Sequence, residues 1–539
     1  MCDRLISGQM VIMTRFAAVG LLMACAAGSV LLALLVSPWW WFAGAPLLAL
    51  ALTGGYDLLQ RRHTVLRNYP VLGHLRFFME TLRPELQQYF VERNYDGRPY
   101  DRDTRSIVYE RAKGVAAEEP FGSERDMDER GYEFLVPSMA PAKVPEEPPR
   151  VRIGGPDCTK PYDMALLNVS AMSFGALSAN AIVALNTGAA RGGFAHDTGE
   201  GGLSEYHLRP GGDLIWEIGT GYFGCRTRDG DFDPRQFAEK AAHPAVRCVT
   251  LKLSQGAKPG IGGVLPGGKV NAEIASVRGV PQGETVVSPP YHRVFSTPRE
   301  LVRFLARMRE LADGKPVGFK LCPGSRTQFL AVCKAMAAEG ITPDFIVVDG
   351  AEGGTGAAPL EFADHLGMPL TEGLIMVHSA LTGTGLRDRI RLGASGKVAT
   401  GSDIVKRLVM GADYTNAARA MMFAVGCIQA QRCHTNHCPT GVTTQDPYRA
   451  RALNVPDKAA RVERFQRNTV QSALQILAAM GVRSAADLSP RLLRRREDHG
   501  RFRSYAELYE WLSPGELLAA PPGSWAADWH AADPDTFAT

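Results

Sequence analysis

From residue 165 onward, short runs rich in β-branched and aromatic residues alternate with longer helical runs. This alternation is typical of βα units around a parallel sheet. Eight units predict an α/β fold of the TIM (β/α)8 barrel type, whereas a doubly wound open sheet is disfavoured because no G-x-G-x-x-G motif follows the first strand. The eight predicted strands are ALLNVSAM (165–172), GFAHDTG (193–199), GYFGC (221–225), VRCVTLKL (246–253), VGFKLC (317–322), DFIVVDG (344–350), IRLGASG (390–396) and DYTNAARA (413–420).

Polar residues gather where these predicted strands end, and in a TIM barrel the strand ends build the active site. Lys252 and Lys320 stand among apolar residues, and a buried ammonium needs an anionic partner such as the polar edge of a reduced flavin. Glycine-rich turns at 393–404, followed by Asn416–Arg419, suit a phosphate group, although such turns are often only turns. We therefore expect a phosphate-bearing flavin at this end of the barrel.

Three cysteines, Cys427, Cys433 and Cys438, have a C-x5-C-x4-C spacing, with His434 beside the second and Pro439 after the third. Thiolates this close can bind one soft metal centre. Three ligands suit a three-iron cluster, or a cubane with one outside ligand. Zinc is the rival because Cys3His sites exist, but paired C-x2-C knuckles are missing. Three buried structural cysteines remain the simplest alternative.

Composition limits the partners and the compartment. The net charge is +4 and charged residues are 22% of the chain, which gives no sign of a nucleic-acid partner. The ten cysteines show no paired secretory framework, so we expect a reducing compartment for the main domain. The 56 glycines cluster in loops at 191–270 and 349–401, which suggests that backbone lies close to a ligand there.

The N-terminal region contains an uncharged run at 16–36 and a second apolar run that ends near Leu59. Each is long enough to cross a bilayer, so we predict a two-helix transmembrane hairpin; the alternative is a buried helix pair in a soluble protein. Arginines precede the first run and follow the second, but the loop between them has none. The positive-inside rule then predicts a multi-pass protein of the cell inner membrane with its catalytic body in the cytoplasm.

These patterns divide the chain into four predicted parts. Residues 1–63 form the transmembrane hairpin, 64–150 a helical and then extended connecting arm, 151–450 the barrel with the cysteine loop, and 451–539 a helical extension and tail. We expect the basic run at 491–500 to lie on a helix face and the last twenty residues to be disordered.

Several blocks of the predicted barrel resemble the FMN-binding synthase domain of glutamate synthase. They are TGEGG (198–202), QGAKPG (255–260), LPGGKV (265–270), SPP-x-H (288–292), GGTGA-x-P (353–359), GLRDRI (385–390) and the cysteine spacing. The resemblance implies FMN beside a 3Fe-4S cluster. It also implies the reduction of 2-iminoglutarate, formed from 2-oxoglutarate and ammonia, to L-glutamate.

The resemblance assigns roles to residues of this sequence. Residues expected around the flavin ring and its polar edge are Ala171, Met172, Ser173, Gln255 and Lys320. Residues expected at the ribityl–phosphate tail are Gly353, Gly354, Ser395, Gly396 and Ala417. Those expected to act on the substrates are Lys258 and Lys252, which hold the oxo-acid and donate a proton, together with Gln255 and with Glu200, which gates ammonia. Cys427, Cys433 and Cys438 would bind the cluster.

Two departures leave the substrate and the reductant open. Ile261 stands where the large synthases often have glutamate, and neither a glutaminase domain nor a dinucleotide-binding motif is recognisable. We therefore expect free ammonia or an amine, with a separate amidotransferase subunit as one source of the ammonia, and a separate electron donor that is ferredoxin-like or a membrane carrier. The alternatives are a flavin subunit of N-methylglutamate synthase type that uses methylamine, and a noncatalytic membrane subunit that transfers electrons.

Overall fold

The computed structural model describes residues 2–115, 118, 120–498 and 500–538, and side chains from residue 16 onward. The chain divides into two units, Met1–Gly97 and Arg98–Thr539. Residues 64–97 therefore group with the N-terminal helices, and residues 98–150 group with the barrel. Each unit is described by itself.

The first unit is helical. It contains α1 (Cys2–Leu35), α2 (Trp41–Leu59), α3 (Thr64–Asn68) and α4 (Gly73–Leu86), which continues into a π-helical turn at Gln87–Val91. Helices α1 and α2 pack against each other. Phe16–Leu35 and Pro38–Leu59 are long and apolar enough to cross a membrane, by length and composition.

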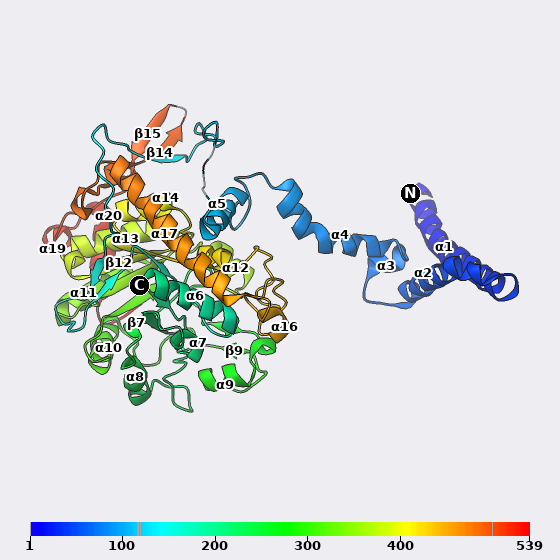
Figure 1. Cartoon of the computed structure of the whole chain (residues 1–539), viewed down its shortest axis with the longest axis horizontal. Coiled ribbons are helices and arrows are strands. Elements are labelled where there is room, and N and C mark those ends of the chain that lie inside the picture. Colours follow the sequence, from blue (N-terminus) through cyan, green and yellow to red (C-terminus); the bar gives the residue numbers. More distant parts are fainter. Residues whose placement is uncertain (1, 116–117, 119, 499, 539) are drawn as a thin grey trace. The chain divides into compact units, whose positions relative to one another are not determined.

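The second unit is built on a closed barrel of eight parallel strands, which confirms the predicted fold (Figure 1). β13 pairs with β4 to close the barrel, with Asn416 opposite Asn168. In order around the barrel the strands are β4 (Leu167–Val169), β5 (His196–Asp197), β6 (Leu214–Ile218), β7 (Val246–Lys252), β10 (Val317–Leu321), β11 (Phe345–Asp349), β12 (Arg391–Ser395) and β13 (Tyr414–Ala417).

The prediction of the third strand was wrong. Residues 221–225 form a turn, and the strand is β6, with the sequence LIWEI and every residue buried. A strand of a parallel barrel is covered on both faces, so it shows no polar alternation. Glu217 interrupts this apolar run, so the sequence pattern does not resemble that of a buried strand.

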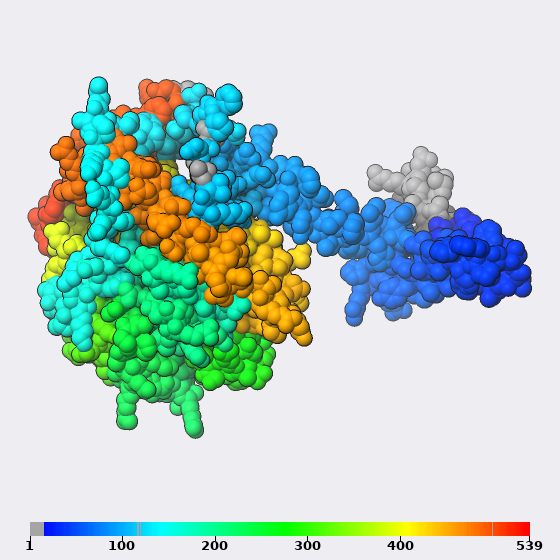
Figure 2. Space-filling view, viewed as in Figure 1, coloured from blue at the N-terminus to red at the C-terminus, as the bar shows by residue number. Residues whose placement is uncertain are grey.

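An outer layer of helices covers the strands, as Figure 1 shows. Its main members are α6 (Ala179–Gly192), α8 (Pro234–Ala241), α10 (Pro298–Leu311), α11 (Arg326–Glu339), α13 (Leu370–Gly383), α14 (Gly401–Val409), α15 (Arg419–Ala424) and α17 (Val455–Ala479). In Figure 2, α17 (orange) lies on the surface beside α6 (green), against which it packs. It also packs against α5 (Arg102–Lys113), a helix of the predicted connecting arm.

A short hairpin closes the amino-terminal end of the barrel. Its strands are β2 (Val151–Ile153) and β3 (Tyr162–Met164). Ile153 and Met164 are fully buried in one cluster with Ile215 and Tyr414 of the barrel strands. Because this end is filled by apolar side chains, the carboxyl end of the barrel is the one left for a ligand.

The C-terminal region differs from the prediction in two places. Residues 493–498, expected on a helix, form β14 (Leu493–Asp498), which pairs with β15 (Arg501–Ser504) and with β1 (Glu133–Leu135). The tail expected to be disordered contains α20 (Gly523–Ala531), which packs against α11. Trp525 is only 3% exposed there, and Thr327 donates a hydrogen bond of 2.6 Å to Asp528. Apolar contact with α11 orders a segment whose own composition is weakly structured.

Candidate active site

A cavity of about 950 Å³ opens at the carboxyl end of the barrel. All the predicted site residues except Ala417 line it: Ala171, Met172, Ser173, Glu200, Lys252, Gln255, Lys258, Lys320, Gly353, Gly354, Ser395, Gly396, Cys427, Cys433 and Cys438. Ala417 is buried, and its neighbours Asn416 and Ala418 line the cavity instead. Ile261 is not among the lining residues. Residues up to 267 positions apart in the sequence thus meet at one site, as the parallel barrel requires.

One wall of the cavity carries a buried ion pair. Lys252, the last residue of β7, places Nζ 2.9 Å from Glu200 Oε2, and these side chains are 9% and 16% exposed. Lys252 also donates a hydrogen bond to Gln255. Burial opposes ionisation of Glu200, but the charges of Lys252 and Lys258 lower its pKa to about 2. Glu200 is therefore an anion at neutral pH.

Lys258 faces the same cavity and is buried. Burial lowers its pKa to about 8; the Glu200 carboxylate opposes this shift, and repulsion from Lys252 and Arg278 adds to it. An ammonium with a pKa near the working pH is suited to general acid chemistry. Arg278, also buried, lines the cavity and donates a hydrogen bond to the carbonyl of Phe174 at 3.1 Å. The sequence patterns did not single out Arg278.

A second buried pair lies deeper, between Lys320 of β10 and Glu217 of β6. Burial alone would lower the pKa of Lys320, but Glu217, Asp197 and Asp349 raise it overall. Burial, and then repulsion from Glu217, raises the pKa of Asp197. Lys320, one of the two lysines singled out in the sequence, therefore has its anionic partner within the protein. Glu217 was missed because the third strand was misplaced.

Two buried histidines hold the strand ends in position. His292 Nε2 lies 2.9 Å from the carbonyl oxygen of Lys252, and His207 Nε2 lies 2.9 Å from that of Met172. A carbonyl only accepts, so each Nε2 carries the proton, and each Nδ1 accepts from the hydroxyl of Tyr222 or Ser204. Burial lowers the pKa of both histidines to about 4, which keeps them neutral.

On the opposite side of the cavity, glycine backbone packs closely against neighbouring side chains, and positively charged side chains lie beside it. A Cβ at Gly354 would lie 2.7 Å from Cδ of Arg419, and Gly396 has a φ of +149°, which a side chain would strain. Burial, and then repulsion from Arg419 and Arg98, lowers the pKa of Lys397. Oδ1 of the buried Asn416 has no hydrogen-bond partner within the described part of the chain. Cations beside glycine backbone can form an anion site.

The cysteine loop forms another part of the lining. Cys438 is 8% exposed, and its Sγ lies 3.5 Å from Oγ1 of Thr440; Cys427 Sγ accepts from the N–H of Gln429 at 3.4 Å. Within the described residues, no group of three or more His, Cys, Asp or Glu side chains converges closely enough to hold one metal ion. The cluster assignment therefore stays a prediction.

The predicted connecting arm supports this loop, which the sequence did not indicate. Tyr109 donates a hydrogen bond of 2.8 Å to the carbonyl of Cys427. Tyr100 exchanges two hydrogen bonds with the side chain of Gln429, at 3.2 and 3.0 Å, and its own side chain lines the cavity. Residues 98–113 are therefore part of the site and not only a spacer.

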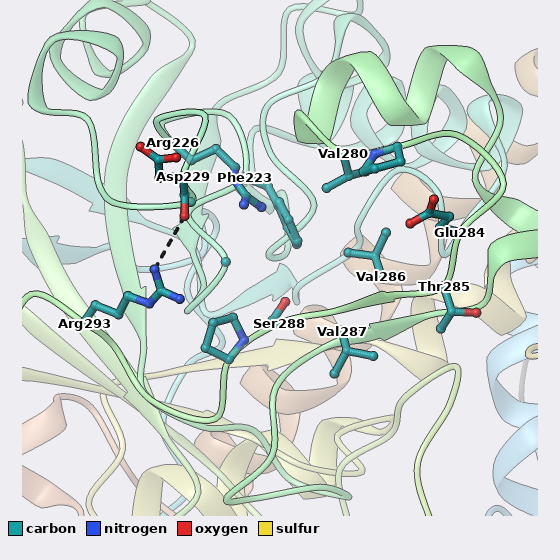
Figure 3. Close-up of a pocket in the computed structure, with 14 residues that line it drawn as sticks. Phe223, Arg226, Asp229, Val280, Glu284, Thr285, Val286, Val287, Ser288 and Arg293 are labelled. Atoms are coloured by element: carbon teal, nitrogen blue, oxygen red, sulfur yellow. Dashed lines mark hydrogen bonds between the residues drawn. The ribbon is translucent and has the colours of Figure 1, made fainter.

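A second, smaller cavity of about 280 Å³ is lined by residues that include Phe223, Arg226 and Arg293 (Figure 3). Arg293 donates a hydrogen bond of 3.5 Å to the carbonyl of Asp229 there. Two guanidinium groups lie over the ring of Phe223: Cζ of Arg226 is 5.5 Å and Cζ of Arg278 is 5.1 Å from the ring centroid. None of the predicted site residues lines this second cavity.

Comparison with known proteins decides the family. A sequence model described as the conserved region in glutamate synthase matches residues 157–483. The chain belongs to the glutamate synthase family. This confirms the resemblance, and the protein is an oxidoreductase of the glutamate synthase type, acting on CH–NH2 donors.

The relatives cover different shares of this family member. The glutamate synthase large subunit-like protein YerD of Bacillus subtilis is 37% identical over 484 residues, 82% of this chain and 92% of YerD. The archaeal glutamate synthase (NADPH) of Methanocaldococcus jannaschii is 33% identical over 322 residues, 59% of this chain and 60% of that protein. The glutamate synthase (NADPH) large chain of Azospirillum brasilense is 34% identical over 320 residues, only 20% of its length.

Solved structures match this chain only weakly. A mandelate oxidase variant with benzaldehyde has a TM-score of 0.41 and 14% identity, covering 74% of this chain and 98% of its own. A likeness this weak supports no inference about the chemistry of the site.

Proposed function

We propose that the main cavity binds FMN and that the protein reduces 2-iminoglutarate, formed from 2-oxoglutarate and ammonia, to L-glutamate. One observation carries the proposal: the Lys252–Glu200 pair, Lys258, the glycine-rich anion site and the cysteine loop all line a single cavity. A cofactor in that cavity would touch each of these groups at once.

The residues present fit FMN. The volume of about 950 Å³ lies within the usual range for a cofactor site. Gly354, Lys397 and Arg419 would hold the phosphate, because closely packed glycine backbone and positive charge meet there. Asn416 and Lys320 would bind the polar edge of the ring. Bound FMN would supply the hydride that reduces the imine carbon.

The substrate end of the cavity matches a dicarboxylate. Lys252, Lys258 and Arg278 contribute three positive charges and Glu200 one negative charge, which leaves a net charge of +2 for a dianionic oxo-acid. Glu200, held as an anion, would attract ammonium. Lys258 would donate a proton to the developing amine, because its pKa of about 8 leaves it mostly protonated but ready to release a proton.

We assign the three thiols to a 3Fe-4S cluster, as the resemblance to the glutamate synthase family implies. One zinc ion binds thiolates at about 2.3 Å, so its ligands must converge on a point. In a three-iron cluster each thiolate binds its own iron, so the thiols stand farther apart. Cys427, Cys433 and Cys438 all line one cavity, which would place such a cluster beside the flavin. Such a cluster would deliver electrons singly from a separate donor.

The proposal also includes a source of nitrogen and an electron donor. Free ammonia or an amine would enter directly, or ammonia would come from a separate amidotransferase subunit; a ferredoxin-like protein or a membrane carrier would supply electrons. Ile261 was the residue that left room for methylamine, and it does not line the cavity. We therefore propose ammonia, and not methylamine, as the nitrogen substrate.

We also propose that the first unit anchors the protein in the cell inner membrane, with the barrel in the cytoplasm. Helices α1 and α2 bury small residues against each other, such as Ala26, Ala33 and Ala51. Their large residues point outward instead, with Leu34 67% and Phe42 77% exposed. This pattern is the reverse of a soluble helix pair and suits packing in lipid.

The test is anaerobic purification of the full chain, followed by absorbance and EPR spectra and by reoxidation of the reduced flavin. We expect bound flavin and iron, with rapid reoxidation by 2-oxoglutarate plus ammonium and little by either alone. Lys258→Met should slow reoxidation without loss of flavin, whereas Lys143→Met, at a surface position 86% exposed, should not. A colourless, iron-free protein would refute the proposal, and faster reoxidation with methylamine would favour the N-methylglutamate alternative.

A further inference from the structure

Helix α4 (Gly73–Leu86) carries a row of large apolar side chains on its surface. Leu75 is 60% exposed, Phe78 57%, Met79 47%, Leu82 37% and Leu86 38%. These positions are spaced by three or four residues, so they share one face of the helix. Tyr89, Phe90 and Val91 of the following π-helical turn are also exposed. An apolar strip about 20 Å long faces outward from the first unit.

The other face of α4 is polar. Arg76 and Glu80 form an exposed ion pair of 2.9 Å one helical turn apart. Arg83, three residues after Glu80, lies on this side as well. An apolar face opposite a face with arginines is the pattern of helices that lie in the plane of a membrane surface.

The structure ties the start of α4 to the end of the second candidate span. Asp57, in α2, is fully buried; it accepts a hydrogen bond from the N–H of Val71 at 2.9 Å and lies 3.0 Å from Nε2 of His74. A Cβ at Gly73 would come within 2.9 Å of a Leu66 methyl group and 3.3 Å of its Cα, so α3 and α4 meet closely at this glycine. Helix α4 therefore begins where the second span ends, and a bilayer holding that span would have its headgroups at this level.

We propose that α4 lies in the cytoplasmic headgroup–acyl boundary of the bilayer, with its apolar row in the acyl chains. This inference rests on the proposed membrane anchor. The occupant is lipid, because the start of α4 is tied through Asp57 to the end of the second candidate span. Arg61, Arg62 and Arg67 stand between the span and α4, where they would meet anionic lipid headgroups. The helix adds an in-plane attachment to the two spans.

The test uses the full chain in vesicles of phosphatidylethanolamine with phosphatidylglycerol as the anionic lipid. A small fluorophore on a bioorthogonal amino acid replaces Phe78 on the apolar face, Glu80 on the polar face as the matched control, or Leu31 within the first span. We expect a blue shift and strong quenching by lipids spin-labelled near the headgroup at Phe78. The Glu80 probe should instead be quenched by aqueous iodide.

Each other outcome overturns a distinct statement. If the Leu31 probe is quenched by lipid but the Phe78 probe responds to iodide as the Glu80 probe does, the anchor stands and the interfacial helix is wrong. If the Phe78 probe is protected from both quenchers, protein covers the row, either a second copy or another part of the chain, and the proposal fails. If the Leu31 probe is not quenched by lipid, the proposed anchor itself is refuted.

Discussion

The buried pair between Lys320 and Glu217 is the place where one substitution should have the largest effect on the barrel. The two side chains are 5% and 1% exposed. Removing one partner of such a pair costs about 3–5 kcal/mol, because the remaining charge stays buried and uncompensated. In Lys320→Met, Glu217 and Asp197 can share a proton, so we expect the lower end, a loss of about 3 kcal/mol near neutral pH.

The pH dependence of this loss has a defined sign. Without Lys320, the pKa of Asp197 rises further, because burial and repulsion from Glu217 lose the largest charge that opposes them. A carboxyl with a higher pKa in the folded than in the unfolded state binds protons more tightly when folded, so stability falls as pH rises toward the folded value. The deficit of Lys320→Met should therefore be larger at about pH 8 than at about pH 5.5.

The assay is guanidinium unfolding of the full chain, followed by circular dichroism and by release of flavin. Lys320→Met combined with Glu217→Gln should recover at least about 1 kcal/mol relative to the sum of the single changes. Lys143→Met, which removes an exposed charge, should stay within about 0.5 kcal/mol of the parent protein. A loss below about 1 kcal/mol for Lys320→Met, with additive single effects, would refute the buried pair.

Three further predictions address other parts of the molecule. Cys433→Ala should lower the iron content while leaving the circular dichroism unchanged; full iron occupancy would contradict the cluster. Because burial lowers the pKa of Lys258 to about 8 and the protonated form is the donor, the rate of flavin reoxidation should fall as pH rises through about 8 in stopped-flow experiments. Lys258→Arg should shift that decline upward, and a flat profile for the parent would count against Lys258 as the acid. Trp525→Ala should lower the free energy of unfolding by about 3–5 kcal/mol, since it empties a buried site on α11; no measurable loss would mean that the tail is disordered.

Local patterns carried most of the fold prediction. Seven of the eight predicted strands overlap barrel strands, because a buried parallel strand is a short apolar run bounded by glycine or polar residues. The exception is β6, where Glu217 interrupts the run. The tail and the 493–498 strand were misassigned for a related reason: each is ordered by a partner distant in sequence, α11 for α20 and β1 for β14.

The sequence by itself determined the barrel, the glycine-rich turns and the cysteine spacing, because each depends on residues close together in the chain. Only the tertiary structure decided which charges meet. It pairs Lys320 with Glu217 and Lys252 with Glu200, brings Arg278 to the same cavity, and braces the cysteine loop with Tyr100 and Tyr109. Partner choice among buried charges depends on three-dimensional distance and burial, which no local pattern contains.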